Sequence, residues 1–210
     1  ACPGQDQIYN THVVVDDAGA IKAAYRKIHL YDVPMVGLIE SKQAIAGDQL
    51  VVCNSPAGRL GVTICYDMRF PELYQKLTFL HGAQVLLMPS AFAVKTGKAH
   101  WETLLRCRAI ETQCYVVAAA QAGQHNTDGN QRRSYGHAMA FDPWGTCIAD
   151  LGENGTDIAT FEIDLGLVQS TRDNMPMHAH RRYDLYGDGP HARTPDASQP
   201  EQSADDMFFG

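Results

Sequence analysis

The sequence predicts an α/β fold with mixed β-sheets, and three observations on the 210-residue chain lead to this class. Short apolar and β-branched runs bounded by turn residues recur along the chain, as strands require. Other segments place their apolar residues at helical spacing. Within residues 59–90, a strand, a helix and a second strand follow one another. Two strands joined by such a helix are parallel, whereas hairpins elsewhere join antiparallel strands, so the sheets should be mixed.

The predicted strands are short, and turn sequences separate several of them. DDAG at 16–19 and DPWG at 142–145 have the composition of hairpin turns, with Gly closing each. The expected strands cover residues 11–16, 20–27, 49–53, 59–65, 83–90, 114–121, 135–142, 146–151 and 157–164.

Two helices are predicted with clear boundaries or patterns. Residues 70–81 carry their apolar side chains on one face, with Pro71 in the first turn and Gly82 just beyond the end. The second helix covers about 98–113, where leucines and a tryptophan alternate with arginines. A shorter helix is expected over 164–173.

Composition indicates one globular domain over residues 1–186, followed by a different kind of segment. The chain is 45% hydrophobic and 20% charged, which is ordinary for a globular protein. Residues 187–210 are rich in Pro, Gly, Ser and acidic residues, so we expect a disordered tail or linker. The formal charge of −7 does not favour nucleic acid or an anionic membrane as a partner. No run of about 18 apolar residues predicts a membrane span.

The cysteines are spread widely and form no C-x-x-C pair. In a chain of this size and composition we interpret them as reduced, intracellular thiols and expect a cytoplasmic protein. The six are Cys2, Cys53, Cys65, Cys107, Cys114 and Cys147.

Cys65 is singled out by its place at the end of the apolar run RLGVTIC, directly before the predicted helix. A helix N-terminus has free N–H groups and the positive end of the helix dipole, which favour a reactive thiolate. The N–H of Tyr66 is placed to face a developing oxyanion. The alternative is a buried structural cysteine, the commoner fate of a free Cys.

Lys27 ends a strand-like segment in YRKIHL. A lysine held by acidic partners can stabilise a tetrahedral intermediate and pass a proton to a leaving amine. The alternative is a solvated lysine on an edge strand.

Four sequence blocks, in order, carry a family resemblance: YRKIHL, GVTICYDMRFPEL, HWETLLRCRAIETQCYVVAAAQ and SYGHAMAFDPWG. From about residue 8 to 186 the chain resembles the nitrilase superfamily of carbon–nitrogen hydrolases. It is most similar to the branch that contains the amidase for deaminated glutathione. Some members of that branch are fused to a Fhit-type histidine-triad nucleotide hydrolase.

The resemblance implies a four-layer α-β-β-α sandwich that pairs across helical faces into dimers or higher oligomers. It also implies a Cys–Glu–Lys catalytic triad without metal or cofactor. Cys65 matches the nucleophile, Lys27 the lysine, and Glu40 a second family glutamate that positions substrate and lysine. His100 and Trp101 belong to a block that lines the pocket in this interpretation. The alternative for them is a helix start with Trp in the core and an acid in the first turn.

The general-base glutamate of the triad should lie well upstream of the lysine, yet no Glu precedes Glu40. The chain opens at ACPGQDQIYN, without Met. We therefore expect the N-terminal part of the domain to be missing, with a degraded pseudo-enzyme as the alternative. A mitochondrial form stays open for the same reason.

Three further candidates are interpreted as non-catalytic. Arg69 and Glu72 flank the nucleophile turn, and we expect a structural ion pair. HAH at 178–180 has no evident third ligand, which makes a metal site a weak interpretation. A Cys–His dyad with His137 is set aside because no thiol-protease signature surrounds Cys65.

The functional hypothesis is an amidase that hydrolyses a small linear carboxamide through a cysteine thioester, releasing ammonia from a terminal amide. By resemblance the substrate is deaminated glutathione, with 2-oxoglutaramate or 2-oxosuccinamate, the substrates of an ω-amidase, as the alternative. A hypothesis of another class is a non-catalytic oligomerisation module that presents a C-terminal partner domain, such as a Fhit-type domain.

Overall fold

The structure, a computed structural model, describes residues 7–126, 128–129 and 131–186. The predicted tail at 187–210 lies outside the described residues. The strands are β1 Thr11–Val15, β2 Ile21–Arg26, β3 Asp32–Val33, β4 Leu38–Ile39, β5 Val51–Ser55, β6 Gly58–Val62, β7 Val85–Leu87, β8 Tyr115–Ala118, β9 Ala122–Gln124, β10 Arg133–Tyr135, β11 Met139–Phe141 and β12 Cys147–Asp150. The α-helices are α1 Pro71–Gln75, α2 Val94–Thr112, α3 Leu165–Asn174 and α4 Tyr183–Tyr186. The 3₁₀ turns are η1 Pro34–Val36, η2 Glu40–Lys42 and η3 Cys65–Arg69, and η4 Lys76–Leu80 is a π turn.

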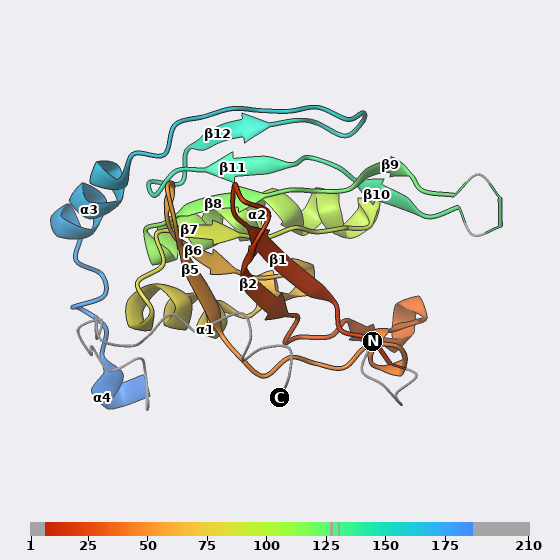
Figure 1. The fold of residues 1–210 in the computed structure, drawn as a ribbon, viewed down its shortest axis with the longest axis horizontal. Coiled ribbons are helices and arrows are strands. Elements are labelled where there is room, and N and C mark those ends of the chain that lie inside the picture. Colours follow the sequence, from red (N-terminus) through yellow and green to blue (C-terminus); the bar gives the residue numbers. More distant parts are fainter. Residues whose placement is uncertain (1–6, 127, 130, 187–210) are drawn as a thin grey trace.

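A six-stranded mixed sheet forms the centre of the fold, in the order β12-β11-β8-β7-β6-β5 (Figure 1). The β6–β7 and β7–β8 pairs are parallel, and the remaining pairs are antiparallel. The parallel β6–β7 pair confirms the strand–helix–strand unit predicted over 59–90. The β11–β12 hairpin confirms the turn at 142–145, and the β1–β2 hairpin confirms the turn at 16–19.

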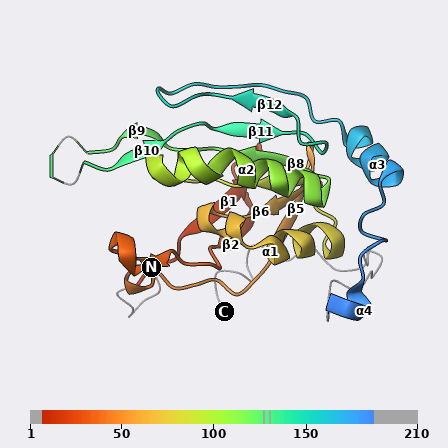
Figure 2. The ribbon, with the colours of Figure 1, turned by 180° about the vertical axis from the view of Figure 1, so that it is seen from behind.

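The two faces of the sheet are covered by different layers. Helices α1 and α2 lie on one face, in front in Figure 2, and the β1–β2 hairpin crosses the other face, in front in Figure 1. Successive side chains of a strand point to opposite faces of the sheet, so each strand contributes apolar residues to both faces. Leu86 and Val116 pack in the cluster under the helices, whereas Val85 and Tyr115, one residue earlier, pack in a cluster on the opposite face.

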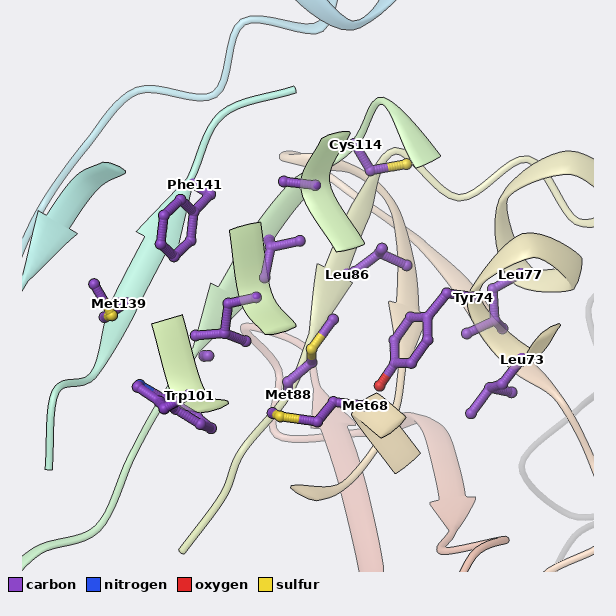
Figure 3. Packing of buried hydrophobic residues seen from close by; sticks show 14 of the residues in the cluster. Met68, Leu73, Tyr74, Leu77, Leu86, Met88, Trp101, Cys114, Met139 and Phe141 are labelled. Atoms are coloured by element: carbon purple, nitrogen blue, oxygen red, sulfur yellow. The ribbon is translucent and has the colours of Figure 1, made fainter. Parts of the chain in front are cut away.

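The cluster under the helices reaches the turn η3. Met68 of η3 is fully buried and lies with Met88 between Trp101 of α2 and Tyr74 of α1 (Figure 3). Flexible methionine side chains fill irregular gaps between larger rings. The turn that begins at Cys65 is therefore held in place by the packing of Met68 in the main core.

The described residues form three layers of the predicted α-β-β-α sandwich: helices, the six-stranded sheet, and the β1–β2 hairpin as part of a second β layer. They do not form the fourth, helical layer. The α/β class with mixed sheets is confirmed. In the part of the chain that the structure describes, no helix has the length and hydropathy that crossing a bilayer requires.

Some boundaries differ from the predictions. The strand expected at 157–164 is wrong: these residues pair with no described strand, and Ile158 there is 84% exposed. A β-type sequence forms a strand only beside a partner edge. Helix α2 begins at Val94, about a turn before the predicted start, and the helix expected over 70–81 divides into α1 and the π turn η4. The short pairs β3–β4 and β9–β10 were not predicted.

Candidate active site

Cys65 lies where the strand β6 gives way to the turn η3. Its backbone has φ +47°, a left-handed conformation that is uncommon outside glycine and often occurs at functional sites. The Cys65 N–H donates to the carbonyl of Pro89 at 3.0 Å, which fixes the turn against the chain after β7. The thiol is partly buried, and its Sγ lies 4.0 Å from the carbonyl oxygen of Ala91. The sulfur is held in place yet retains some exposure.

The backbone N–H of Tyr66 is the second in η3. First-turn N–H groups have no partner within their own helix, and no hydrogen bond from the Tyr66 N–H is found to any described residue. This donor is therefore free to meet an oxygen atom placed beside Cys65.

Lys27 is only 3% exposed, just beyond the end of β2. Its Nζ donates to Oε2 of Glu40 at 2.5 Å. A buried ammonium is costly to leave without a counter-charge, and Glu40 supplies that charge. The solvated-lysine alternative is excluded by this burial.

Glu40 opens η2 and receives hydrogen bonds on both carboxylate oxygens. Its Oε2 also accepts the Tyr31 N–H at 2.7 Å, and its Oε1 accepts Nδ2 of Asn10 at 3.2 Å. Burial alone would raise the pKa of Glu40, but the hydrogen bonds from Lys27, Tyr31 and Asn10 together outweigh it and hold the pKa below its ordinary value. Glu40 is thus a fixed anion and a poor proton acceptor.

The segment that carries Lys27 packs directly beside η3, the turn that begins at Cys65. Tyr25 and Ile64 belong to one buried cluster, and Ile28 and Cys65 pack against it. The structure therefore brings together the lysine and cysteine regions that the sequence had placed 38 positions apart, from 27 to 65. Asn10, Tyr31 and Asp67 were not singled out from the sequence, since a single polar residue in a loop gives no periodic signal.

His100 and Trp101 occupy different environments. His100 is exposed on α2, and its Nδ1 lies 3.4 Å from Nη2 of Arg69. Trp101 is 1% exposed, and its indole N–H donates to the carbonyl of His137 at 2.6 Å. This placement favours the core interpretation of Trp101 over substrate contact. Because α2 begins at Val94, HWE lies within the helix and not at its start.

The ion pair expected between Arg69 and Glu72 is wrong. None of the ion pairs among the described residues joins them. Instead, the Arg69 guanidinium lies over the rings of Phe92, at 5.5 Å, and Tyr66, at 6.0 Å. Such cation–aromatic contacts, with His100 beside them, hold the guanidinium near η3.

The remaining candidates lie elsewhere. His137 bonds through Nδ1 to Asp150 at 2.9 Å and stacks on Tyr135. No group of three or more His, Cys, Asp or Glu suited to a metal ion occurs within the described ranges. Cys65, Cys107, Cys114 and Cys147 form no disulfide within the described residues, and Cys2 lies outside them.

Comparison with known proteins identifies close relatives. The family model described as carbon-nitrogen hydrolase matches residues 3–173. The deaminated glutathione amidase of Dictyostelium discoideum is 50% identical over 185 residues, which cover 86% of this chain and 62% of that protein. The crystal structure of the NitFhit protein of Caenorhabditis elegans superposes with a TM-score of 0.80 at 49% identity, covering 86% of this chain and 44% of that one.

A more distant structure shows a reacted site. A variant of the amidase from Nesterenkonia sp. AN1, with the acetamide moiety of fluoroacetamide added covalently at its active-site cysteine, is 26% identical with a TM-score of 0.59. The match covers 80% of this chain and 61% of that one. The chain spans about three fifths of the Dictyostelium relative and 40% of the nematode fusion protein.

Proposed function

Because the chain belongs to the carbon–nitrogen hydrolase family, we propose that the protein is an amidase of the Cys–Glu–Lys type with Cys65 as nucleophile. One observation carries this proposal. A partly exposed thiol at φ +47°, at the start of η3, packs beside the segment that bears Lys27, whose buried ammonium pairs with the partly buried Glu40. A structural cysteine would need neither a left-handed backbone nor a buried, paired lysine near it.

The chemistry divides one difficult step into two. The Cys65 thiolate attacks the amide carbonyl, and the free N–H of Tyr66 together with the Lys27 ammonium stabilises the oxyanion. The C–N bond then breaks as the Lys27 ammonium passes a proton to the leaving nitrogen, which departs as ammonia or an amine, and a thioester remains. Water attacks the thioester, which releases the acid and restores the Cys65 thiolate, and the remaining proton of the water returns to Lys27. Glu40 holds the side chain of Lys27 in place through their hydrogen bond.

Activation of that water needs a general base, and Glu40 is unsuited to it because its pKa is lowered and both its oxygens are engaged. We assign the base to a glutamate in a segment upstream of residue 1, as the family resemblance implies. The greater length of the curated relatives is consistent with this assignment.

The proposed substrate is deaminated glutathione, because relatives that are 50% and 49% identical to this chain are named deaminated glutathione amidase. An ω-amidase substrate such as 2-oxoglutaramate is the competing choice. Relatives from Caenorhabditis elegans and Drosophila melanogaster are named as fusions with a fragile histidine triad protein. A Fhit-type domain beyond residue 210, and homodimers formed across helical faces, belong to the same proposal.

The test uses what we call the extended protein. It consists of this chain preceded by an N-terminal segment that carries a glutamate and brings the amidase part to the length it has in the relatives. Product release is measured from deaminated glutathione and from 2-oxoglutaramate. Cys65→Ala should abolish turnover while the thermal transition stays close to that of the parent. Retained turnover in Cys65→Ala would overturn the proposal. Cys107→Ala, at an exposed thiol on α2, is the matched control and should keep full activity.

A further inference from the structure

Asp67 is a fully buried carboxylate inside the nucleophile turn, two residues after Cys65. Its Oδ2 accepts the backbone N–H of Ile64 at 2.9 Å and the hydroxyl of Tyr25 at 2.7 Å. Its Oδ1 accepts the backbone N–H of His29 at 3.1 Å and lies 2.8 Å from the Nδ1 atom of that residue. Because a carboxylate only accepts, the last contact places a hydrogen on Nδ1. Four donors thus surround one buried side chain.

These donors come from two different parts of the chain. Ile64 belongs to the turn of Cys65, whereas Tyr25 and His29 stand two residues before and two residues after Lys27. The contacts of Asp67 therefore join the segment that bears the proposed lysine to the turn that bears the proposed nucleophile.

Tyr25 and His29 each make a second contact that holds the lysine segment in place. The Tyr25 hydroxyl also accepts the backbone N–H of Ile28 at 3.2 Å, so one oxygen links Asp67 to the chain directly after Lys27. The His29 ring stacks on Phe70 with centroids 3.7 Å apart and planes 9° from parallel. Burial, followed by the charge of Asp67, raises the pKa of Tyr25, so its hydroxyl remains a donor.

The hydrogen bond of the Lys27 ammonium among the described residues goes to Glu40. The ammonium is thus held on one side by Glu40, while the backbone that carries it is held to the nucleophile turn through Asp67. Misplacement of a reacting group by about 1 Å can reduce a rate about a hundredfold. A buried anion with four donors is suited to fixing such a distance.

We propose that Asp67 is a positioning residue that sets the separation between the Lys27 ammonium and the Cys65 sulfur. This inference rests on the proposed function, since it assigns Asp67 to the same reaction. Asp67 does not touch the substrate in this scheme; it acts through Lys27 and Cys65.

The main test is Asp67→Asn in the extended protein. Asparagine keeps the shape of the side chain, but its NH₂ group faces two donors and cannot accept from them, so two of the four hydrogen bonds are lost. We expect kcat to fall about thirtyfold or more while KM changes less than about threefold, because the loss concerns the transition state and not ground-state binding. When Asp67→Asn is combined with Lys27→Arg, kcat should fall little further than in Lys27→Arg alone, since both changes act through the same ammonium.

Two further variants separate positioning from general destabilisation. Tyr25→Phe removes one hydroxyl without a change of shape and should lower kcat about five- to tenfold, with little further loss when combined with Asp67→Asn. Val168→Ala, in α3 and 1% exposed, is the control, since it loosens a different cluster and should lower the melting temperature while kcat stays within twofold.

Two results would overturn the inference while leaving the proposed function intact, provided that Cys65→Ala and Lys27→Arg abolish or strongly reduce turnover. One is a kcat of Asp67→Asn within threefold of the parent. The other is a double variant, Asp67→Asn with Lys27→Arg, whose fold-loss in kcat equals the product of the two single losses. Turnover retained in Cys65→Ala would instead refute the proposed function and this inference together. If Asp67→Asn does not fold, Tyr25→Phe decides: a kcat within twofold of the parent overturns the inference.

Discussion

Replacing Glu40 by glutamine should destabilise the protein by about 2–3 kcal/mol, because it removes the counter-charge of a buried ammonium. Removal of one member of a buried ion pair costs about 3–5 kcal/mol. Two features place this site below that range. The Glu40 side chain is 21% exposed, so water screens part of the interaction, and the glutamine oxygen still accepts from Lys27 or from the Tyr31 N–H. The amide nitrogen, however, can accept nothing from Asn10.

The measurement is urea unfolding of the extended protein at pH 7, with the midpoint as the readout and the slope expected to stay constant. The thermal midpoint should fall by roughly 5–10 °C. A double-mutant cycle with Lys27→Met isolates the pair, and its coupling energy should be about 2 kcal/mol. Glu153→Gln removes the same charge from the exposed Lys98–Glu153 pair, at 3.6 Å, and should cost about 0.5 kcal/mol or less.

A coupling energy below about 0.5 kcal/mol would refute the reasoning. It would mean that the Lys27 ammonium finds equal compensation without Glu40, and that the pair is not what holds the lysine in place. Equal costs for Glu40→Gln and Glu153→Gln would lead to the same conclusion.

Three other predictions concern the nucleophile, the lysine and the dependence of stability on pH. Cys65 should alkylate faster at neutral pH than Cys107 or Cys147, because partial desolvation of the sulfur raises the pKa of both of those thiols although their residues are exposed overall. Equal rates by mass spectrometry would argue against an activated cysteine. Lys27→Arg should lower turnover about a hundredfold or more, because a planar guanidinium cannot reproduce the position of a compact ammonium; a loss below about threefold would place Lys27 outside the reaction. Burial lowers the pKa of His12, and the hydrogen bond to the Thr63 carbonyl does not restore it. Below the ordinary histidine pKa of about 6.5 the unfolded chain binds a proton that the folded protein resists, so stability should fall as the pH drops from 7.5 to 5.5. The His12→Gln variant should lose less stability over the same pH interval. An unchanged slope of stability against pH would contradict the assignment of this dependence to His12.

The sequence by itself determined the features that depend on local spacing. The β-type run that ends before Cys65, the start of a helix at Pro71 and the hairpin at 142–145 all follow from residues within a few positions of one another. Such patterns are readable because one strand or one turn of helix repeats its geometry every two to four residues. The motif blocks containing Lys27 and Cys65 could be recognised for the same reason.

Tertiary structure decided every feature that requires a partner distant in sequence. The strand expected at 157–164 found no edge to pair with, Arg69 turned toward His100 and not Glu72, and Trp101 went into the core. The four donors around Asp67 come from two segments far apart in the sequence, and no local pattern predicts them. The identity of a side chain states which contacts it can make, but only the assembled chain, with its burial and its competing donors, selects which of them form.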